Sequence, residues 1–204
     1  MIVTILGWAM LIFGVLVFLL GFPKQAKSIE VNRSVRGVSL FLVVATYGAC
    51  FIWFWYGVRT GQWKELVVSN GFALPASIFL LSRFRVYGPW SAAKKAVGTA
   101  IFVCGTLVLA LFVITHWDLP SVMAIWAPRA NHLCLAAMIW QVWLQKEDPQ
   151  GFDVLRALFQ FLAFFAGFGY GVAAGNEALI EGNALLTVFT FIILSRGLHA
   201  RWRA

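Results

Sequence analysis

Seven stretches of about 20 mostly apolar residues dominate this sequence, and the segments between them are short. A helix of about 20 residues is long enough to cross the hydrocarbon core of a bilayer. Because 61% of the 204 residues are hydrophobic and little chain is left over, a soluble domain of any size is excluded. We expect an all-α membrane protein with seven transmembrane helices, at residues 2–22, 37–59, 65–82, 97–116, 119–144, 154–173 and 178–195.

The net charge of +8 comes from cations that gather on one side of these predicted helices. Arg59 and Lys64 fall on the opposite side, and Arg129 falls inside the fifth helix. Such a 13-to-2 division follows the positive-inside rule if the N-terminus is outside and the C-terminus cytoplasmic. The basicity therefore reflects topology, predicts no nucleic-acid binding, and suits an integral protein of a bacterial inner membrane. The 13 cations are Lys24, Lys27, Arg33, Arg36, Arg83, Arg85, Lys94, Lys95, Lys146, Arg156, Arg196, Arg201 and Arg203.

The chain contains an internal repeat. Tyr56 lies 19 residues after Gly37 and 14 before Asn70, while Tyr170 lies 19 residues after Gly151 and 13 before Asn183. Three helices are an odd number, so a direct fusion of two copies would leave them in opposite orientations. One additional crossing at residues 97–116 restores the same orientation. We therefore predict a 3+1+3 plan of parallel triple-helix repeats joined by an inversion linker helix.

This plan divides the chain into four parts. Residues 1–83 form the first triple-helix repeat, and residues 84–118 form a cytoplasmic connector with the linker helix. Residues 119–195 form the second repeat, and residues 196–204 form a cytoplasmic basic tail. Turn residues and aromatic side chains between residues 84 and 90 suit a connector at the membrane interface.

Several short motifs resemble a known family. They are Gly21-Phe22-Pro23-Lys24-Gln25, Arg33-Ser34-Val35-Arg36-Gly37-Val38-Ser39, Trp53-Phe54-Trp55-Tyr56-Gly57 and Asn70, with a looser match at Asp148-Pro149-Gln150-Gly151-Phe152-Asp153, Tyr170-Gly171 and Asn183. The sequence resembles the PQ-loop superfamily, and most closely the SWEET and SemiSWEET sugar transporters. The resemblance implies a seven-helix facilitator with a central pocket and alternating access. It implies that Trp53 and Asn70 line the pocket and that Pro23 supplies a hinge at the inner gate.

The sequence also departs from this family pattern. Lys24 separates the proline and glutamine that name the superfamily, and the second repeat has Ala137 and Met138 where Pro23 maps. Gly167 stands at the position that matches Trp53. We therefore expect a lopsided pocket, with an aromatic wall on one side and a small residue on the other.

Asn70 and Asn183 are the first candidates for binding a solute, because each amide offers two donors and an acceptor inside an apolar segment. Their alternative role is hydrogen bonding between helices. Trp53 can stack on a sugar ring or a planar solute, and the alternative for it is packing. Tyr56 and Tyr170, one turn farther out, are candidate outer-gate residues or interfacial anchors. The alternative for Pro23 is that it ends the first helix.

Arg129 is the most discordant residue, since a charge near the middle of a membrane helix is costly. No acid is expected at comparable depth. Together with Pro128, Asn131 and His132 it predicts a kinked polar patch that faces the inside of the bundle. Arg129 is expected to bind an anionic group of the substrate, to hold the bundle through carbonyls and an outer glutamate, or to snorkel to the lipid surface. His132 adds proton sensitivity or is a neutral buried side chain.

The function we expect is uniport of a small polar solute, with sugar as the default class. The first alternative is a proton-linked transporter of an amino acid or anionic metabolite that uses Arg129, and the second is a receptor or assembly protein without transport. The sequence shows no motif for an enzyme, a metal or a cofactor. The expected partners are a small-molecule solute and the lipid bilayer, with a homo-oligomer as a further possibility.

Overall fold

The computed structural model describes residues 1–35, 38–117, 120–147 and 153–202, which form helices joined by short connections. Within these described residues, seven helices are long and apolar enough to cross a membrane, as predicted. The first crossing consists of α1 (Ile2–Leu16), the π-helical turn η1 (Val17–Gly21) and α2 (Phe22–Asn32). The others are α3 (Leu40–Thr60), η2 with α4 (Trp63–Val68 and Ser69–Tyr87), α5 (Ala92–Thr115), α6 (Pro120–Glu147), α7 (Val154–Ala174) and α8 (Glu177–Trp202).

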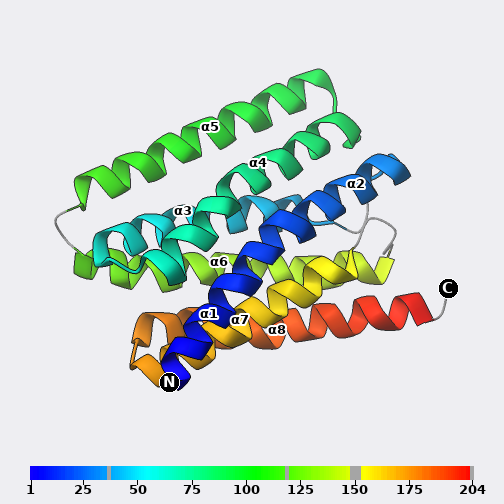
Figure 1. The fold of residues 1–204 in the computed structure, drawn as a ribbon. Coiled ribbons are helices and arrows are strands. Elements are labelled where there is room, and N and C mark those ends of the chain that lie inside the picture. The colour runs from blue at the N-terminus through cyan, green and yellow to red at the C-terminus, as the bar shows by residue number, and fades with distance from the viewer. Residues whose placement is uncertain (36–37, 118–119, 148–152, 203–204) are drawn as a thin grey trace.

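The two triple-helix units pack against each other through two helix pairs, α1 with α7 and α3 with α6 (Figure 1). The linker helix α5 lies at the edge of the bundle, where it packs on α3. Only Val113 is buried on α5, so nearly all of its apolar surface is left for lipid. The arrangement confirms the predicted 3+1+3 fold.

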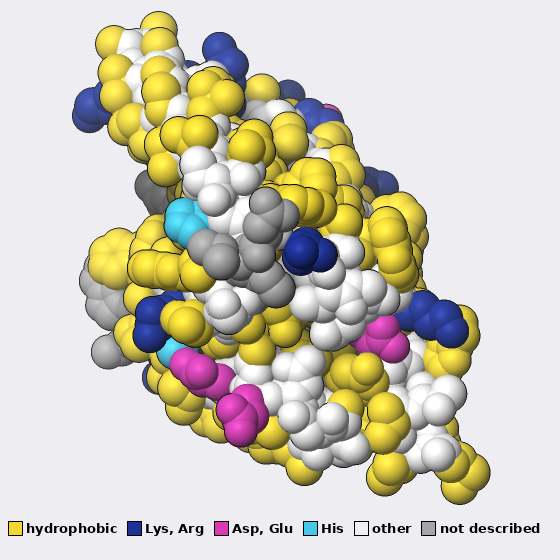
Figure 2. All heavy atoms as spheres, turned by 90° about the vertical axis from the view of Figure 1, so that its left-hand side faces the viewer, with side chains coloured by type: hydrophobic (Ala, Val, Ile, Leu, Met, Phe, Trp, Pro, Cys, Tyr) yellow, Lys and Arg dark blue, Asp and Glu magenta, His cyan; other side chains and the backbone are white. Residues whose placement is uncertain are grey.

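The bundle has two chemically different ends. The end where α2 stops and α7 begins, on the right in Figure 1, carries Lys24, Lys27, Arg33, Arg83, Arg85, Lys94, Lys95 and Arg196. We call it the basic end, and we call the opposite end, which holds Met1, the N-terminal end. Figure 2 looks onto the N-terminal end, where the few charged side chains lie among hydrophobic ones.

The two repeats have the same turn at the N-terminal end. Gly61 ends α3 at φ 72° and Gly175 ends α7 at φ 65°, a left-handed conformation that favours glycine. The next residue then donates its N–H to the carbonyl of Gly57 or Gly171, at 2.9 Å in both repeats. The repeat inferred from tyrosine and asparagine spacing therefore extends to backbone geometry. Gly37 and Gly151, which also define that spacing, lie outside the described residues.

The structure explains why the two repeats differ by one residue in spacing. Gly61 precedes Leu66 by five residues, whereas Gly175 precedes Leu179 by four. The additional residue falls in η2, a π-helical segment whose wider turns hold more residues than α-helical turns. The α-helical turn that follows then brings Asn70 to the same place in its repeat as Asn183.

The first helix is longer than its apolar stretch indicates, so both the predicted end at residue 22 and the reading of Pro23 as a terminator are wrong. The helix continues through Pro23 to Asn32. The wide turn of η1 ends at Gly21, two residues before Pro23, which lacks an N–H to donate. Beyond it the side chains of Phe22, Gln25, Ala26 and Ile29 form one buried face, and this packing maintains the helix.

Candidate functional site

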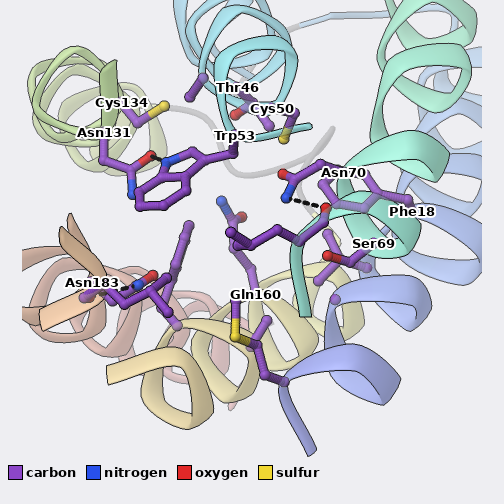
Figure 3. Close-up of a pocket in the computed structure, with 18 residues that line it drawn as sticks. Phe18, Thr46, Cys50, Trp53, Ser69, Asn70, Asn131, Cys134, Gln160 and Asn183 are labelled. Carbon is purple, nitrogen blue, oxygen red and sulfur yellow. Dashed lines mark hydrogen bonds between the residues drawn. The ribbon is translucent and has the colours of Figure 1, made fainter. Parts of the chain in front are cut away.

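A central pocket lies between the two repeats (Figure 3). Its volume of about 90 Å³ is enough for a few water molecules. Every described side chain that lines it is uncharged, and its polar groups are amides, hydroxyls and thiols. The lining residues are Met10, Gly14, Val17, Phe18, Thr46, Ala49, Cys50, Trp53, Leu66, Ser69, Asn70, Asn131, Cys134, Gln160, Ala163, Phe164, Leu179 and Asn183.

Asn70 and Asn183 both line this pocket and are held in the same way. The Nδ2 of Asn70 donates to the carbonyl of Leu66 at 2.7 Å, and the Nδ2 of Asn183 donates to the carbonyl of Leu179 at 2.8 Å. These bonds fix each amide on its own helix. No described residue hydrogen-bonds the side-chain oxygen of either asparagine, so both can accept a hydrogen bond from a solute hydroxyl.

Trp53 is held by a chain of hydrogen bonds that links both repeats. Its Nε1 donates to Oδ1 of Asn131 at 3.0 Å, and Nδ2 of Asn131 donates to the carbonyl of Gly182 at 2.9 Å. Trp53 and Asn131 are each 5% exposed. Because its polar edge is satisfied, the indole presents an apolar ring surface to the pocket (Figure 3).

The two repeats differ where the first has Trp53 and the second has Gly167. A Cβ atom at Gly167 would lie 3.3 Å from the amide of Asn183. At the matching position of the first repeat stands the large side chain of Trp53. Gly167, which does not itself line the pocket, therefore leaves the space that the Asn183 amide uses. Both repeats contribute aromatic and amide side chains to the lining, Phe18 and Asn70 from the first and Phe164 and Asn183 from the second, so the expected one-sided aromatic wall is not observed.

Arg129 and His132 do not face the central pocket, contrary to the predicted inward patch. Both are exposed on α6, whereas Asn131 between them is buried. The guanidinium of Arg129 lies 5.5 Å from the ring centre of Trp126. Residues two apart on a helix point about 200° away from each other, so Arg129 and Asn131 cannot share a face.

The expectation that no acid lies at the depth of Arg129 is also wrong. Glu181 lies with Arg129 in a second cavity near the N-terminal end, and its carboxylate is 4.0 Å from Nε2 of His132. Asn131 bonds the carbonyl of Gly182, so this part of α6 lies beside the start of α8. Their position outside the central pocket gives Arg129 and His132 no contact with a solute held there.

Tyr56 and Tyr170 border different cavities near the N-terminal end. Tyr56 is buried edge-on against Trp53, with ring centres 5.6 Å apart, and reaches the second cavity with Arg129 and Glu181. Tyr170 borders a third cavity with Trp8, Lys64 and Glu65. Each tyrosine thus lies between the central pocket and the N-terminal end of its own repeat, and a gating role for them stays a prediction.

Two glutamines that the sequence analysis missed join the two repeats near the basic end. The Oε1 of Gln25 accepts the N–H of Asp153 at 3.0 Å, and the Oε1 of Gln141 accepts the N–H of Ser39 at 2.7 Å. Ser39 and Asp153 are the residues that cap α3 and α7. Each repeat therefore sends one glutamine to the first residue of a helix in the other repeat. The sequence feature that could have identified Gln25 is its place in the proline-glutamine motif.

Thr46 and Gln160 are pocket residues that sequence reasoning also missed. They line the pocket from α3 and α7, seven residues after Ser39 and Asp153 respectively. Aligning the two repeats on their helix starts would have paired them. Most of the looser motif in the second repeat, residues 148–152, lies outside the described residues.

Comparison with known proteins agrees with this geometry. Residues 4–92 match a family model described as a sugar efflux transporter for intercellular exchange. The structure of a eukaryotic SWEET transporter superposes with a TM-score of 0.71 at 17% identity, covering 97% of this chain and 95% of that one. The predicted resemblance to SWEET transporters is confirmed. The matched family is one of transporters, the SWEET fold extends over both repeats, and no curated relative matches the chain by sequence.

Proposed function

We propose that this protein transports a sugar across a membrane by alternating access through the central pocket. The observation that carries the proposal is the pair of asparagine amides, one from each repeat, whose side-chain oxygens stay available inside an uncharged pocket. Sugars offer hydroxyl donors to such acceptors and apolar C–H faces to an aromatic ring. The description of the matched family as sugar efflux transporters supports this substrate class.

The pocket residues then have distinct roles. Asn70 and Asn183 accept hydrogen bonds from the sugar, and the indole of Trp53 packs on the ring face. Asn131 positions that indole and is itself a pocket residue. Binding and a bundle with two states are sufficient for uniport, because no bond in the solute is made or broken.

Access alternates between the two ends of the bundle. The bonds of Gln25 and Gln141 join the two repeats near the basic end and would have to break for that end to open, and the π-helical turn before Pro23 gives the first helix a place to bend. Tyr56 and Tyr170 control the N-terminal end. The positive-inside rule orients the basic end toward the cytoplasm and the N-terminus outside.

Counterflow of labelled glucose into proteoliposomes tests the proposal. Asn70→Ala and Asn183→Ala are each expected to lower exchange by about tenfold, because one lost hydrogen bond of about 1.4 kcal/mol corresponds to that factor. Phe72→Ala is a matched control, since Phe72 is exposed on the same helix as Asn70 and does not line the pocket. A labelled amino acid is run in parallel. Exchange of the amino acid alone, or equal exchange by all variants, contradicts the proposal.

A further inference from the structure

Arg156 carries a buried charge that the proposed sugar site does not use. The sequence analysis counted it among the 13 cations on one side of the membrane, and the structure places it near the start of α7 with a side chain that is 3% exposed. Its guanidinium lies 4.5 Å from the ring centre of Phe22. Its Nε and Nη2 are buried and have no hydrogen-bond partner among the described residues. An arginine in this position loses its hydration without full replacement, which is unfavourable.

Asp153 is the acid beside Arg156, and it does not satisfy the guanidinium. Its Oδ1 accepts the backbone N–H of Arg156 at 3.0 Å, which caps α7. The ion pairs found among the described residues join Arg83 to Glu30 and His132 to Glu181, and none joins the side chains of Asp153 and Arg156. The negative charge of the Asp153 carboxylate is also partly balanced by the backbone amides at the start of α7.

The first repeat shows that the fold does not require an arginine here. Ser39 caps α3 by accepting the N–H of Leu42 at 3.1 Å, as Asp153 does with Arg156. Leu42 is therefore the counterpart of Arg156, and it is equally buried, at 3% exposed. An apolar side chain fills this position in one repeat, so the charge in the other repeat has a purpose beyond packing.

The guanidinium lies one layer of side chains from the central pocket, toward the basic end. Gln160, one turn farther along the same face of α7, lines the pocket. Phe22, which lies against the guanidinium, is in ring contact with Phe18 at 5.0 Å between centres, and Phe18 also lines the pocket. Arg156 is thus a buried cation one helical turn from a pocket whose described lining carries no charge of its own.

We propose that Arg156 is a carboxylate subsite, and that the pocket accepts sugar acids such as hexuronates. The inference rests on the proposed sugar transport. When the basic end opens, the bond from Asp153 to Gln25 breaks and α2 carries Phe22 away from Arg156. The guanidinium then lies at the mouth of the pocket and binds the carboxylate with two parallel hydrogen bonds. The hydroxyl groups of the sugar acid stay with Asn70 and Asn183.

The test is counterflow of labelled glucuronate and labelled glucose in parallel, with wild type, Arg156→Leu and Arg156→Lys. Arg156→Leu places the counterpart residue of the first repeat in the second. Glucuronate exchange is expected to fall by at least about tenfold in Arg156→Leu, while glucose exchange stays within about twofold of wild type. Arg156→Lys, which keeps the charge but not the planar fork, is expected to retain part of the glucuronate exchange.

Three outcomes overturn the subsite. They are a wild type that exchanges glucose but not glucuronate, an Arg156→Leu variant that still exchanges glucuronate, and equal loss of both solutes, which would assign Arg156 to gating. If wild type exchanges neither solute, sugar transport itself fails and the subsite fails with it. Thermal unfolding of wild type in detergent provides a readout that needs no variant. Glucuronate is expected to raise the unfolding temperature more than glucose, and an equal or smaller rise contradicts the subsite.

Discussion

Replacing Asn131 with alanine is expected to lower glucose counterflow by at least about tenfold, through the loss of two buried hydrogen bonds of about 1 kcal/mol each. The substitution leaves Nε1 of Trp53 and the carbonyl of Gly182 without their shared partner. The indole then loses its fixed orientation against the pocket, and the contact between α6 and α8 weakens. Asn131→Asp keeps an acceptor for Nε1 of Trp53 and is expected to lower glucose counterflow less than Asn131→Ala does.

Arg129→Ala and His132→Ala are the matched controls, because they lie on the same helix but outside the central pocket. Both are expected to keep exchange within about twofold of wild type, as surface substitutions usually do. The opposite ranking, with Arg129→Ala inactive and Asn131→Ala active, contradicts this description of the site. It would instead favour the alternative hypothesis in which Arg129 binds an anionic solute.

Gly167→Trp, which gives the second repeat the tryptophan of the first, is expected to abolish counterflow. Even a Cβ atom at Gly167 comes within 3.3 Å of the Asn183 amide, so an indole would displace that amide and fill the pocket. Gly105→Trp on α5 is the control, because nothing lies within 4 Å of its Cβ position and the helix faces lipid. Monodisperse elution of both variants in detergent establishes that they fold. Wild-type exchange by Gly167→Trp would mean that solute does not pass Asn183.

Much of the fold follows from the sequence because the bilayer leaves few alternatives. Apolar stretches of this length in a membrane form helices. Two copies of a repeat with an odd number of helices need one additional crossing between them to have the same orientation. The spacing of Tyr56 and Asn70 against Tyr170 and Asn183 located the repeat, and both asparagines line the pocket. The end of the first helix was misplaced because hydropathy does not report the amphipathic face that buries Gln25 and Ile29 beyond Pro23.

The rest of the site depends on contacts between distant residues. Gln25 meets Asp153 across 128 positions and Gln141 meets Ser39 across 102, and no local pattern predicts such pairs. Arg156 was counted only as one of the cations that set the topology, because it stands at the start of an apolar stretch and its burial depends on distant residues such as Phe22. Arg129 was predicted to share an inward-facing patch with Asn131. Helical geometry alone, however, places residues two apart on different faces.

Passage of the solute through the central pocket is tested most directly with the cysteines of the chain. Cys50 and Cys134 line the pocket, while Cys104 lies exposed on α5. In a Cys104→Ser background, a membrane-permeant maleimide is expected to block glucose counterflow, and saturating glucose is expected to slow the labelling. Adding Cys50→Ala and Cys134→Ala should make exchange insensitive to the reagent. Labelling of these two thiols at the same rate with and without glucose, while exchange continues, would contradict transport through this pocket.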